Sequence, residues 1–314
     1  MNIEQLIGDA KNIAILGHIR PDGDCIGSCL GLANYIRDNY KNISVEVFTE
    51  EFTDKFMLLR GADTIRHDYE NAGVYELCIA VDVSDKPRLG AGEACFDKAF
   101  RTLCIDHHYT NEGFADVNVI DSKASAASEL MITLLDNEKI SLATAECLYL
   151  GIIHDTGVFK HSNTTKKTME LAGQMIEKGV NTTRMIDETF YKKTFLQNRL
   201  LGEVLMNTNV YLDGKCIIGG ISYDRICKLG VQPSDMNGVV DQLRITEGVK
   251  CAVFLYGVKE GGCKASIRSD EDVDSSIIAA VYGGGGHIRA SGCNIPGSVE
   301  EATQSILKEI SKQL

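Results

Sequence analysis

Short apolar runs alternate with helical stretches through the first half of the chain. The runs lie at residues 12–17 (NIAILG), 44–49 (SVEVFT), 76–84 (ELCIAVDVS) and 101–108 (RTLCIDHH). Strands that are apolar on both faces are typical of parallel sheets covered by helices on both sides. The alternation therefore predicts an α/β domain with a parallel sheet and flanking helices, in which ligands bind at the carboxyl ends of the strands.

The second half of the chain indicates a smaller, mixed α/β domain. Its predicted elements are a hairpin turning at Asp213 and Gly214, a helix near 234–245, strands at 249–256 and 263–268, and a helix from about 273. The residues before it are helical in pattern. We expect a catalytic domain over 1–185, a helical linker over 186–206 and a substrate-binding domain over 207–314.

Composition excludes several classes of protein. With 32 Lys and Arg against 44 Asp and Glu, the net charge of −12 argues against a protein that coats long nucleic acid. The sequence has no run of eighteen apolar residues and no signal-peptide pattern at its start, so we expect a cytoplasmic protein with no membrane partner. The 11 cysteines lie mostly in apolar runs, which favours buried free thiols. The sequence leaves monomer and homodimer both open.

Acidic and imidazole side chains gather directly after the predicted strands. They are His18, Asp22 and Asp24 after the first run, Asp82 after the third, Asp106, His107 and His108 after the fourth, and Asp155 after the apolar helix AECLYLGII. One such Asp commonly caps a helix, but four groups at the same sheet edge indicate one pocket. Carboxylates this crowded would repel one another, so the site requires bound cations at neutral pH.

The types of ligand indicate which cations these are. Carboxylates with a few imidazoles suit Mn²⁺, Fe²⁺ or Co²⁺ better than a thiolate-rich zinc site does, while Mg²⁺ usually takes oxygen alone. We expect two ions, Mn²⁺ first and Mg²⁺ or Co²⁺ as alternatives, because the acids are too many for one. Two metals that share a carboxylate can activate a water molecule, which predicts hydrolysis of a phosphoester or a phosphoanhydride.

The same residues resemble the ordered motifs of the DHH phosphoesterases. The matching segments are HIRPDGDCIGS (18–28), VDVSD (81–85), DHH (106–108) and GIIHDTGVF (151–159). In the second domain, KASIRS (264–269) and GGGGHIRASG (283–292) resemble the DHHA1 substrate-binding domain. Several motifs in the right order are far more specific than a bare DHH tripeptide. Within this family, the length and the GGGGH segment are similar to the short oligoribonucleases that also dephosphorylate pAp.

The resemblance implies a role for each residue of the pocket. His18 and Asp22 would bind the first metal, Asp24, His107 and Asp155 the second, and Asp82 would bridge the two. Asp106 would orient a neighbouring histidine. His108 would face the scissile phosphate as a hydrogen-bond or proton donor.

The second domain would hold the rest of the substrate. In the DHHA1 context, Gly284, Gly285 and Gly286 would turn backbone N–H groups toward an anion, with charge from His287, Arg289 and Arg268 nearby. Arg268 is the best candidate for a bidentate phosphate contact.

The resemblance implies a metal-dependent phosphoesterase that degrades short oligoribonucleotides (nanoRNA) from an end, removes the 3′-phosphate of pAp, or does both. A cyclic-di-AMP or pApA phosphodiesterase is the alternative. The GGGGH segment argues against an inorganic pyrophosphatase. A non-catalytic nucleotide-binding module is also disfavoured, because every expected metal ligand is present.

Overall fold

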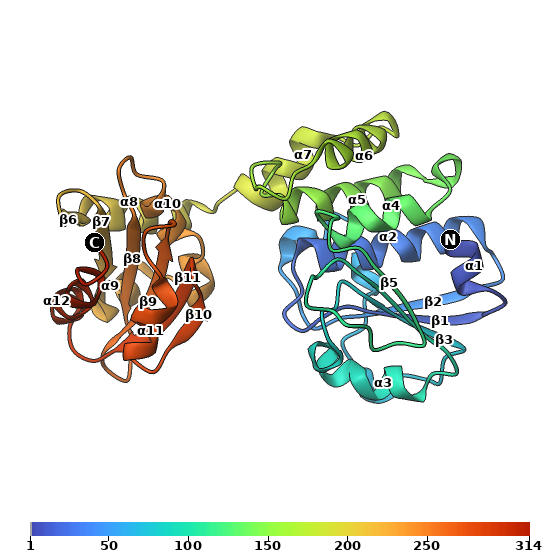
Figure 1. Ribbon diagram of the computed structural model, residues 1–314, viewed down its shortest axis with the longest axis horizontal. Helices are drawn as coiled ribbons and strands as arrows, with labels where there is room; N and C mark the ends of the chain where they lie inside the picture. The colour runs from blue at the N-terminus through green and yellow to red at the C-terminus, as the bar shows by residue number, and fades with distance from the viewer. Residues whose placement is uncertain (1) are drawn as a thin grey trace. The chain divides into compact units, whose positions relative to one another are not determined.

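The computed structural model describes residues 2–314, and the chain divides into two units between Lys192 and Lys193 (Figure 1). A parallel sheet in the order β2-β1-β3-β4-β5 forms the centre of the first unit. Its strands are β1 (Asn12–Leu16), β2 (Ser44–Phe48), β3 (Leu77–Val81), β4 (Thr102–Asp106) and β5 (Val117–Ile120). The predicted parallel sheet is confirmed, and β5 is an addition at its edge.

Helices cover both faces of this sheet. Along β1, Ile13 and Ile15 belong to the core beneath α2, α4 and α5, whereas Ala14 and Leu16 belong to the core beneath α3, on the opposite side in Figure 1. The α-helices of the unit are α1 (Ile3–Ile7), α2 (Gly23–Asn39), α3 (Glu93–Lys98), α4 (Ala127–Leu134), α5 (Leu142–Asp155), α6 (Lys166–Glu177) and α7 (Thr182–Ile186). Short helical turns are η1 (Asp54–Phe56), η2 (Ala62–Thr64), η3 (Tyr69–Asn71), η4 (Lys86–Gly92), η5 (Asn137–Lys139) and the π-helical η6 (Asp187–Tyr191).

Glycines allow α2 and α5 to pack with their backbones close together. A Cβ atom on Gly27 would lie 2.5 Å from the carbonyl oxygen of Cys147, and one on Gly31 would lie 2.6 Å from Leu148 Cδ2. A Cβ atom on Gly151 would overlap Ser128 Oγ and Asp24 Oδ1. The close contact brings the first turn of α2 beside the last turn of α5.

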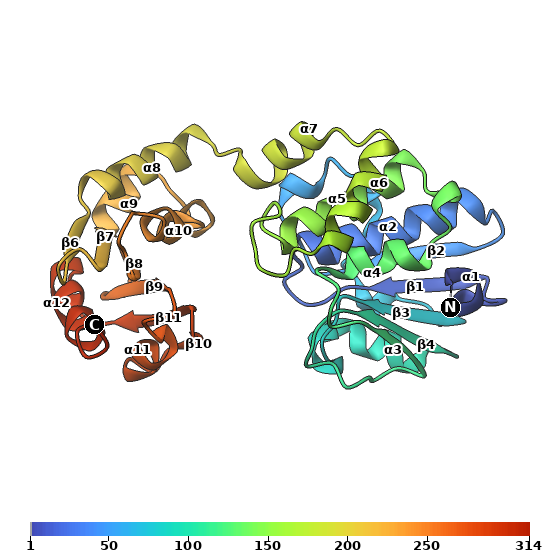
Figure 2. The same cartoon turned by 45° about the horizontal axis from the view of Figure 1, so that its top comes forward.

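The second unit is a mixed sheet in the order β10-β11-β9-β8-β7-β6, with only the β7–β8 pairing parallel among the pairings of the described residues. Its strands are β6 (Asn209–Tyr211), β7 (Cys216–Ile221), β8 (Cys251–Gly257), β9 (Cys263–Ser269), β10 (Gly285–His287) and β11 (Ala290–Ile295). Its helices are α8 (Phe195–Met206), α9 (Tyr223–Leu229), η7 (Pro233–Met236), α10 (Val239–Arg244), α11 (Ser275–Val281) and α12 (Val299–Ile310). Helices α8, α9 and α10 cover one face of the sheet, and α11 and α12 cover the other (Figure 2). The buried side chains of each set belong to a separate core.

The segment 186–206, expected as a linker, is shared between the two units. Residues 187–191 form η6 in the first unit, whereas α8 packs Leu200 and Val204 into the core of the second. These two side chains are four residues apart, so they face the sheet from one side of the helix. The apolar face of α8 makes this helix part of the second unit.

Two composition-based expectations can be compared with the structure. No helix within residues 2–314 is both long enough and apolar enough to cross a membrane. The cysteines are free and buried except for Cys227, which is exposed, as the apolar runs around them predict.

The close contact at Gly151 leads to a first prediction. We expect Gly151→Ala to lower the free energy of unfolding by about 1–3 kcal/mol, because the added methyl group overpacks the contact with Ser128 and Asp24. Gly173→Ala in α6 is the matched control, since a Cβ atom there meets nothing within 4 Å. That change should instead stabilise the protein by about 0.5–1 kcal/mol. Urea denaturation of both variants measures the difference, and equal effects would contradict the assigned contact.

Candidate metal centre

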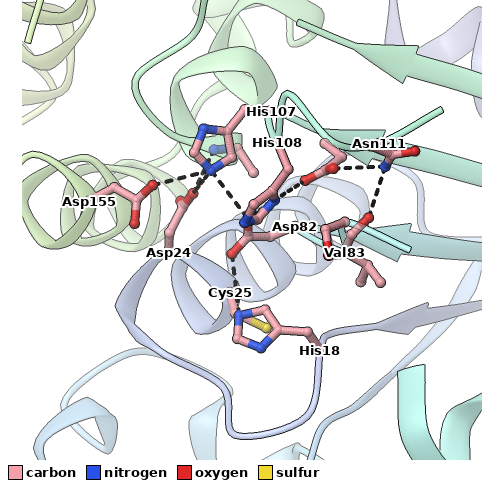
Figure 3. A network of polar contacts seen from close by, with 12 residues as sticks. His18, Asp24, Cys25, Asp82, Val83, His107, His108, Asn111 and Asp155 are labelled. Carbon is pink, nitrogen blue, oxygen red and sulfur yellow. Dashed lines mark hydrogen bonds and ion pairs between the residues drawn. The ribbon is translucent and has the colours of Figure 1, made fainter. Parts of the chain in front are cut away.

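The carboxyl ends of the parallel strands bring the predicted ligands together (Figure 3). His18 follows β1, Asp82 follows β3 and His107 follows β4. Asp22 caps the N-terminus of α2, Asp24 lies in its first turn, and Asp155 ends α5. All six side chains therefore meet at one edge of the sheet, although they come from four separate parts of the sequence.

Asp82 lies at the centre of the cluster. Its Oδ2 is 3.6 Å from Nε2 of His18, and its Oδ1 is 3.5 Å from Nε2 of His107. The residue is 2% exposed, and Oδ1 has no hydrogen-bond partner in the described chain. Its backbone has a φ of +60°, a left-handed conformation that is strained for an aspartate. A buried, strained carboxylate with an unsatisfied oxygen fits a bridging metal ligand.

Two groups of donors lie on either side of Asp82. On the first side, Nε2 of His18 is 3.8 Å from Asp22 Oδ1. On the second side, Nε2 of His107 is 3.2 Å from Asp155 Oδ2 and 3.9 Å from Asp24 Oδ2. The donor atoms of Asp24, His107 and Asp155 form one compact group. On the first side the compact group is His18, Cys25 and Asp82, and Asp22 lies at its exposed rim. Carboxylate oxygens with one imidazole are a donor set that divalent metal ions take.

Backbone carbonyls orient the two imidazoles. Nδ1 of His18 lies 2.8 Å from the Ile19 carbonyl oxygen, and Nδ1 of His107 lies 3.3 Å from that of Ala124. A ring that donates its Nδ1–H to a carbonyl presents the lone pair of Nε2 to the cluster. Both histidines are thus held in the orientation that metal coordination requires.

The carboxylates of the cluster are difficult to keep ionised without cations. Burial raises the pKa of Asp24 well above its usual value, and the charges of Asp82 and Asp155 raise it further. Burial also raises the pKa of Asp155, and Asp82 adds to the effect. Divalent ions would relieve this repulsion, so the residues present fit a metal centre.

The same carboxylates hold protons on the two histidines. Burial lowers the pKa of His107, but Asp155 and Asp82 outweigh it and raise the pKa to about 12. The pKa of His18 is also raised, because Asp22 and Asp82 outweigh burial. In the protein without metal, these carboxylates therefore favour the protonated form of both imidazoles.

A hydrogen-bonded chain orients His108 beside this cluster. Nδ1 of His108 lies 2.8 Å from Oδ1 of the buried Asp106, whose Oδ2 accepts a hydrogen bond of 2.7 Å from Asn111. Asn111 also donates to the Val83 carbonyl at 2.9 Å. Asp106 raises the pKa of His108, whose side chain is 38% exposed. His108 can therefore present a second N–H donor to a ligand outside the cluster.

Three further residues at the site were not singled out as functional by the sequence. Sγ of Cys25 lies within 4.8 Å of donor atoms of His18 and Asp82. The sequence feature that could have drawn attention to Cys25 is its position directly after Asp24. A guanidinium nitrogen of Arg88 lies 3.0 Å from Nδ1 of His18. His154 packs between Phe56 and Phe190, and burial lowers its pKa to about 4, so it is a neutral structural histidine.

The glycine run of the second unit differs from expectation. The N–H groups of Gly283 and Gly284 donate to the Ala280 and Ala279 carbonyls at 3.0 and 2.9 Å, where they end α11. The sequence predicted that the Gly284 N–H binds an anion. In the structure this N–H is already used in a hydrogen bond to Ala279. Gly285 and Gly286 belong to β10, because the run continues as a strand paired with β11.

Strand register places the predicted cationic side chains of the second unit near one another. His287 pairs with Ala290, and Ala290 pairs with Arg268, so all three point to the same face of the sheet. Arg268 Nε is 3.1 Å from Asp241 Oδ1, so this arginine is ion-paired. Arg289 lies beside them in the exposed turn between β10 and β11.

Comparison with known proteins places both units among recognised domains. Residues 12–152 match the model described as "DHH family, N-terminal domain", and residues 214–314 match the "DHHA1 domain". A Bacillus subtilis protein named "Bifunctional oligoribonuclease and PAP phosphatase NrnA" is 30% identical over 88% of this chain and 87% of its own length. A Thermus thermophilus protein of the same name is 28% identical over 96% of this chain and 90% of its own length. A crystal structure of an "exopolyphosphatase-related protein" from Bacteroides fragilis superposes with a TM-score of 0.87, at 25% identity over 99% of this chain and 94% of the other.

The protonated histidines lead to a second prediction. Because a metal must displace the protons that the carboxylates hold on His18 and His107, binding at pH 7 should release up to about two protons per chain. Affinity should fall as the pH is lowered. Calorimetric titration with Mn²⁺ in buffers of different ionisation enthalpy measures the released protons. Binding without proton release would contradict the protonation of this cluster.

Proposed function

The chain belongs to the DHH family of phosphoesterases, and from this premise we propose that it hydrolyses short oligoribonucleotides from an end and removes the 3′-phosphate of pAp. One observation carries the proposal. A single buried carboxylate, that of Asp82, lies between two imidazoles that each belong to a separate group of acids. This arrangement suits hydrolysis of a phosphate ester at a pair of metal ions.

Two divalent ions, with Mn²⁺ first and Co²⁺ or Mg²⁺ as alternatives, would occupy the two donor groups. One ion would be held by His18 and Asp22, and the other by Asp24, His107 and Asp155. Asp82 would contribute to both sites. When bound, such ions neutralise charge on a phosphate and activate water. Four carboxylates are matched in formal charge by two divalent ions, so the loaded centre would not repel a phosphate as the metal-free one does.

His108 would act on the phosphate itself. Asp106 holds Nδ1 of the ring and supports its protonated form, and Asn111 holds Asp106. The exposed N–H of His108 would then donate to a non-bridging oxygen or give a proton to the leaving oxygen. Asp106 and Asn111 are positioning residues in this scheme, because they act through His108.

The second unit would recognise the end of the substrate. Arg268 and His287 flank Ala290 on one sheet face, where the small side chain leaves room for a phosphate or a nucleoside. Arg289 adds positive charge at the neighbouring turn. Asp241 fixes Nε of Arg268, which leaves Nη2 available for a phosphate oxygen.

The net charge fits a short substrate. A protein with a charge of −12 lacks the many phosphate contacts that a long RNA requires, whereas a few cations suffice for a dinucleotide or pAp. The buried free thiols support a reducing compartment, which we take to be the cytoplasm.

A substrate panel tests the proposed function. Purified protein with Mn²⁺ should hydrolyse pAp and linear RNA of two to about five nucleotides, pApA included, with weaker action on cyclic-di-AMP and pyrophosphate. Asp82→Ala is the control, because it should lose both bound metal and turnover. Preferred hydrolysis of the cyclic dinucleotide would favour the alternative function, and turnover of pyrophosphate alone would exclude the role given to the second unit.

The contribution of Arg268 is predicted separately. Arg268→Ala should raise KM for pAp and dinucleotides by about 10- to 100-fold, since it removes a charge-assisted hydrogen bond, while metal content stays unchanged. Arg225→Ala is a matched control, because Arg225 is an exposed arginine of the same unit that pairs with Glu203. Steady-state kinetics and metal analysis of both variants check this. Equal KM values in the two variants would remove Arg268 from the binding site.

A further inference from the structure

Residues 124–128, which lead into α4 and include its first two residues, contact two side chains of the second donor group and are linked to the backbone of its third residue. The Ala124 carbonyl oxygen lies 3.3 Å from Nδ1 of His107. The N–H groups of Ala127 and Ser128 donate to Asp24 at 2.5 and 3.0 Å.

The third residue of the group, Asp155, is linked to the segment through Asn163, which binds the backbone carbonyl of Asp155. The side-chain amide of Asn163 donates to the Ser125 carbonyl at 3.0 Å and to the Asp155 carbonyl at 3.2 Å. The conformation of this five-residue segment therefore helps to place the side chains of His107 and Asp24 and the backbone of Asp155. The first donor group is different, because its imidazole is oriented by Ile19.

The side chains of this segment are too small to hold its conformation by their own packing. The segment consists of Ala and Ser residues that are almost completely buried. Ser128 packs directly against Gly151, where even a Cβ atom would overlap its hydroxyl oxygen. Short side chains make few packing contacts, so the segment needs an anchor from outside.

Glu129 is that anchor. It is 0% exposed, and its Oε2 accepts hydrogen bonds from the Ser125 N–H at 3.2 Å, the Ser125 hydroxyl at 2.6 Å and the Thr168 hydroxyl at 2.7 Å. Its Oε1 has no hydrogen-bond partner in the described residues, and the nearest cation is Lys167 Nζ at 3.8 Å. Burying a carboxylate with such incomplete compensation is costly, so a specific use for it is expected.

We infer that Glu129 is a positioning residue of the second metal ion. By holding Ser125 to α6 through Thr168, it keeps the 124–128 segment in the conformation that presents Asp24, His107 and Asp155 together. Loss of the carboxylate weakens binding of this ion and leaves the ion held by His18 and Asp22 in place. The inference rests on the proposed function, because it assumes that the centre binds two ions.

The test compares Glu129→Met, which keeps the length but removes the hydrogen-bond acceptors, with the conservative Glu129→Gln. We expect Glu129→Met to retain about one Mn²⁺ per chain after gel filtration, where the wild type retains about two. Its weaker site should bind Mn²⁺ about 10- to 100-fold less tightly. Glu129→Gln should restore most of the affinity. With Co²⁺ in place of Mn²⁺, the visible spectrum of Glu129→Met should show loss of one of two cobalt environments.

Tyr75→Phe is the matched control. It removes a part-buried hydrogen bond to another carboxylate of the same unit, that from Tyr75 to Glu46 at 2.5 Å. Tyr75 lies before the start of β3, away from the carboxyl ends of the strands. This variant should lose stability but keep both ions. Thr168→Val, which removes one donor to Glu129, gives a graded version of the effect if Glu129→Met does not fold.

The outcomes separate the two hypotheses. If the wild type binds no divalent ion or cleaves no phosphate ester, the proposed function fails. If the wild type binds two ions but the folded Glu129 or Thr168 variants bind both as tightly as it does, only the inference about Glu129 fails. Equal weakening of both ions, or metal loss matched by Tyr75→Phe, would also overturn it.

Discussion

The structure of the first unit is organised around the burial of mutually repelling carboxylates. Asp24, Asp82 and Asp155 lie within reach of one imidazole, that of His107, at distances of 3.9, 3.5 and 3.2 Å. Isolated buried charges of this kind would destabilise a protein by several kcal/mol each. They persist here because backbone amides and imidazoles partly neutralise them and because the centre is suited to cations that complete the neutralisation.

Several features of the fold serve this cluster directly. The glycine contact between α2 and α5 brings Asp24 and Asp155 together, and the first turn of α4 donates two N–H groups to Asp24. The strained backbone at Asp82 aims its carboxylate into the gap between the histidines. Each feature costs packing or conformational free energy, and together they preorganise the donors before a metal binds.

Local sequence patterns were sufficient to predict much of the fold of the first unit. The apolar runs predicted β1 to β4 and their parallel arrangement, because a strand buried on both faces has a distinctive composition. Local pattern did not predict β5, β10 or β11. β5 is a half-exposed edge strand with an Asn at its centre, and β10 is made of glycine and histidine, so neither has an apolar pattern. In the same way, the glycine run was interpreted as an anion loop, whereas Gly283 and Gly284 end α11.

The sequence by itself determined the fold class, the two-domain plan and the identities of the residues that cluster at the sheet edge, because these depend on composition and on order along the chain. Only the tertiary structure decided how those residues are used. It placed Asp82 between two imidazoles, paired Arg268 with Asp241, and brought Cys25 and Arg88 to the centre. Some of these relations join residues more than a hundred positions apart, such as Asp24 and Ser128. Distances of this kind follow from how helices and strands pack, which no local pattern in the sequence records.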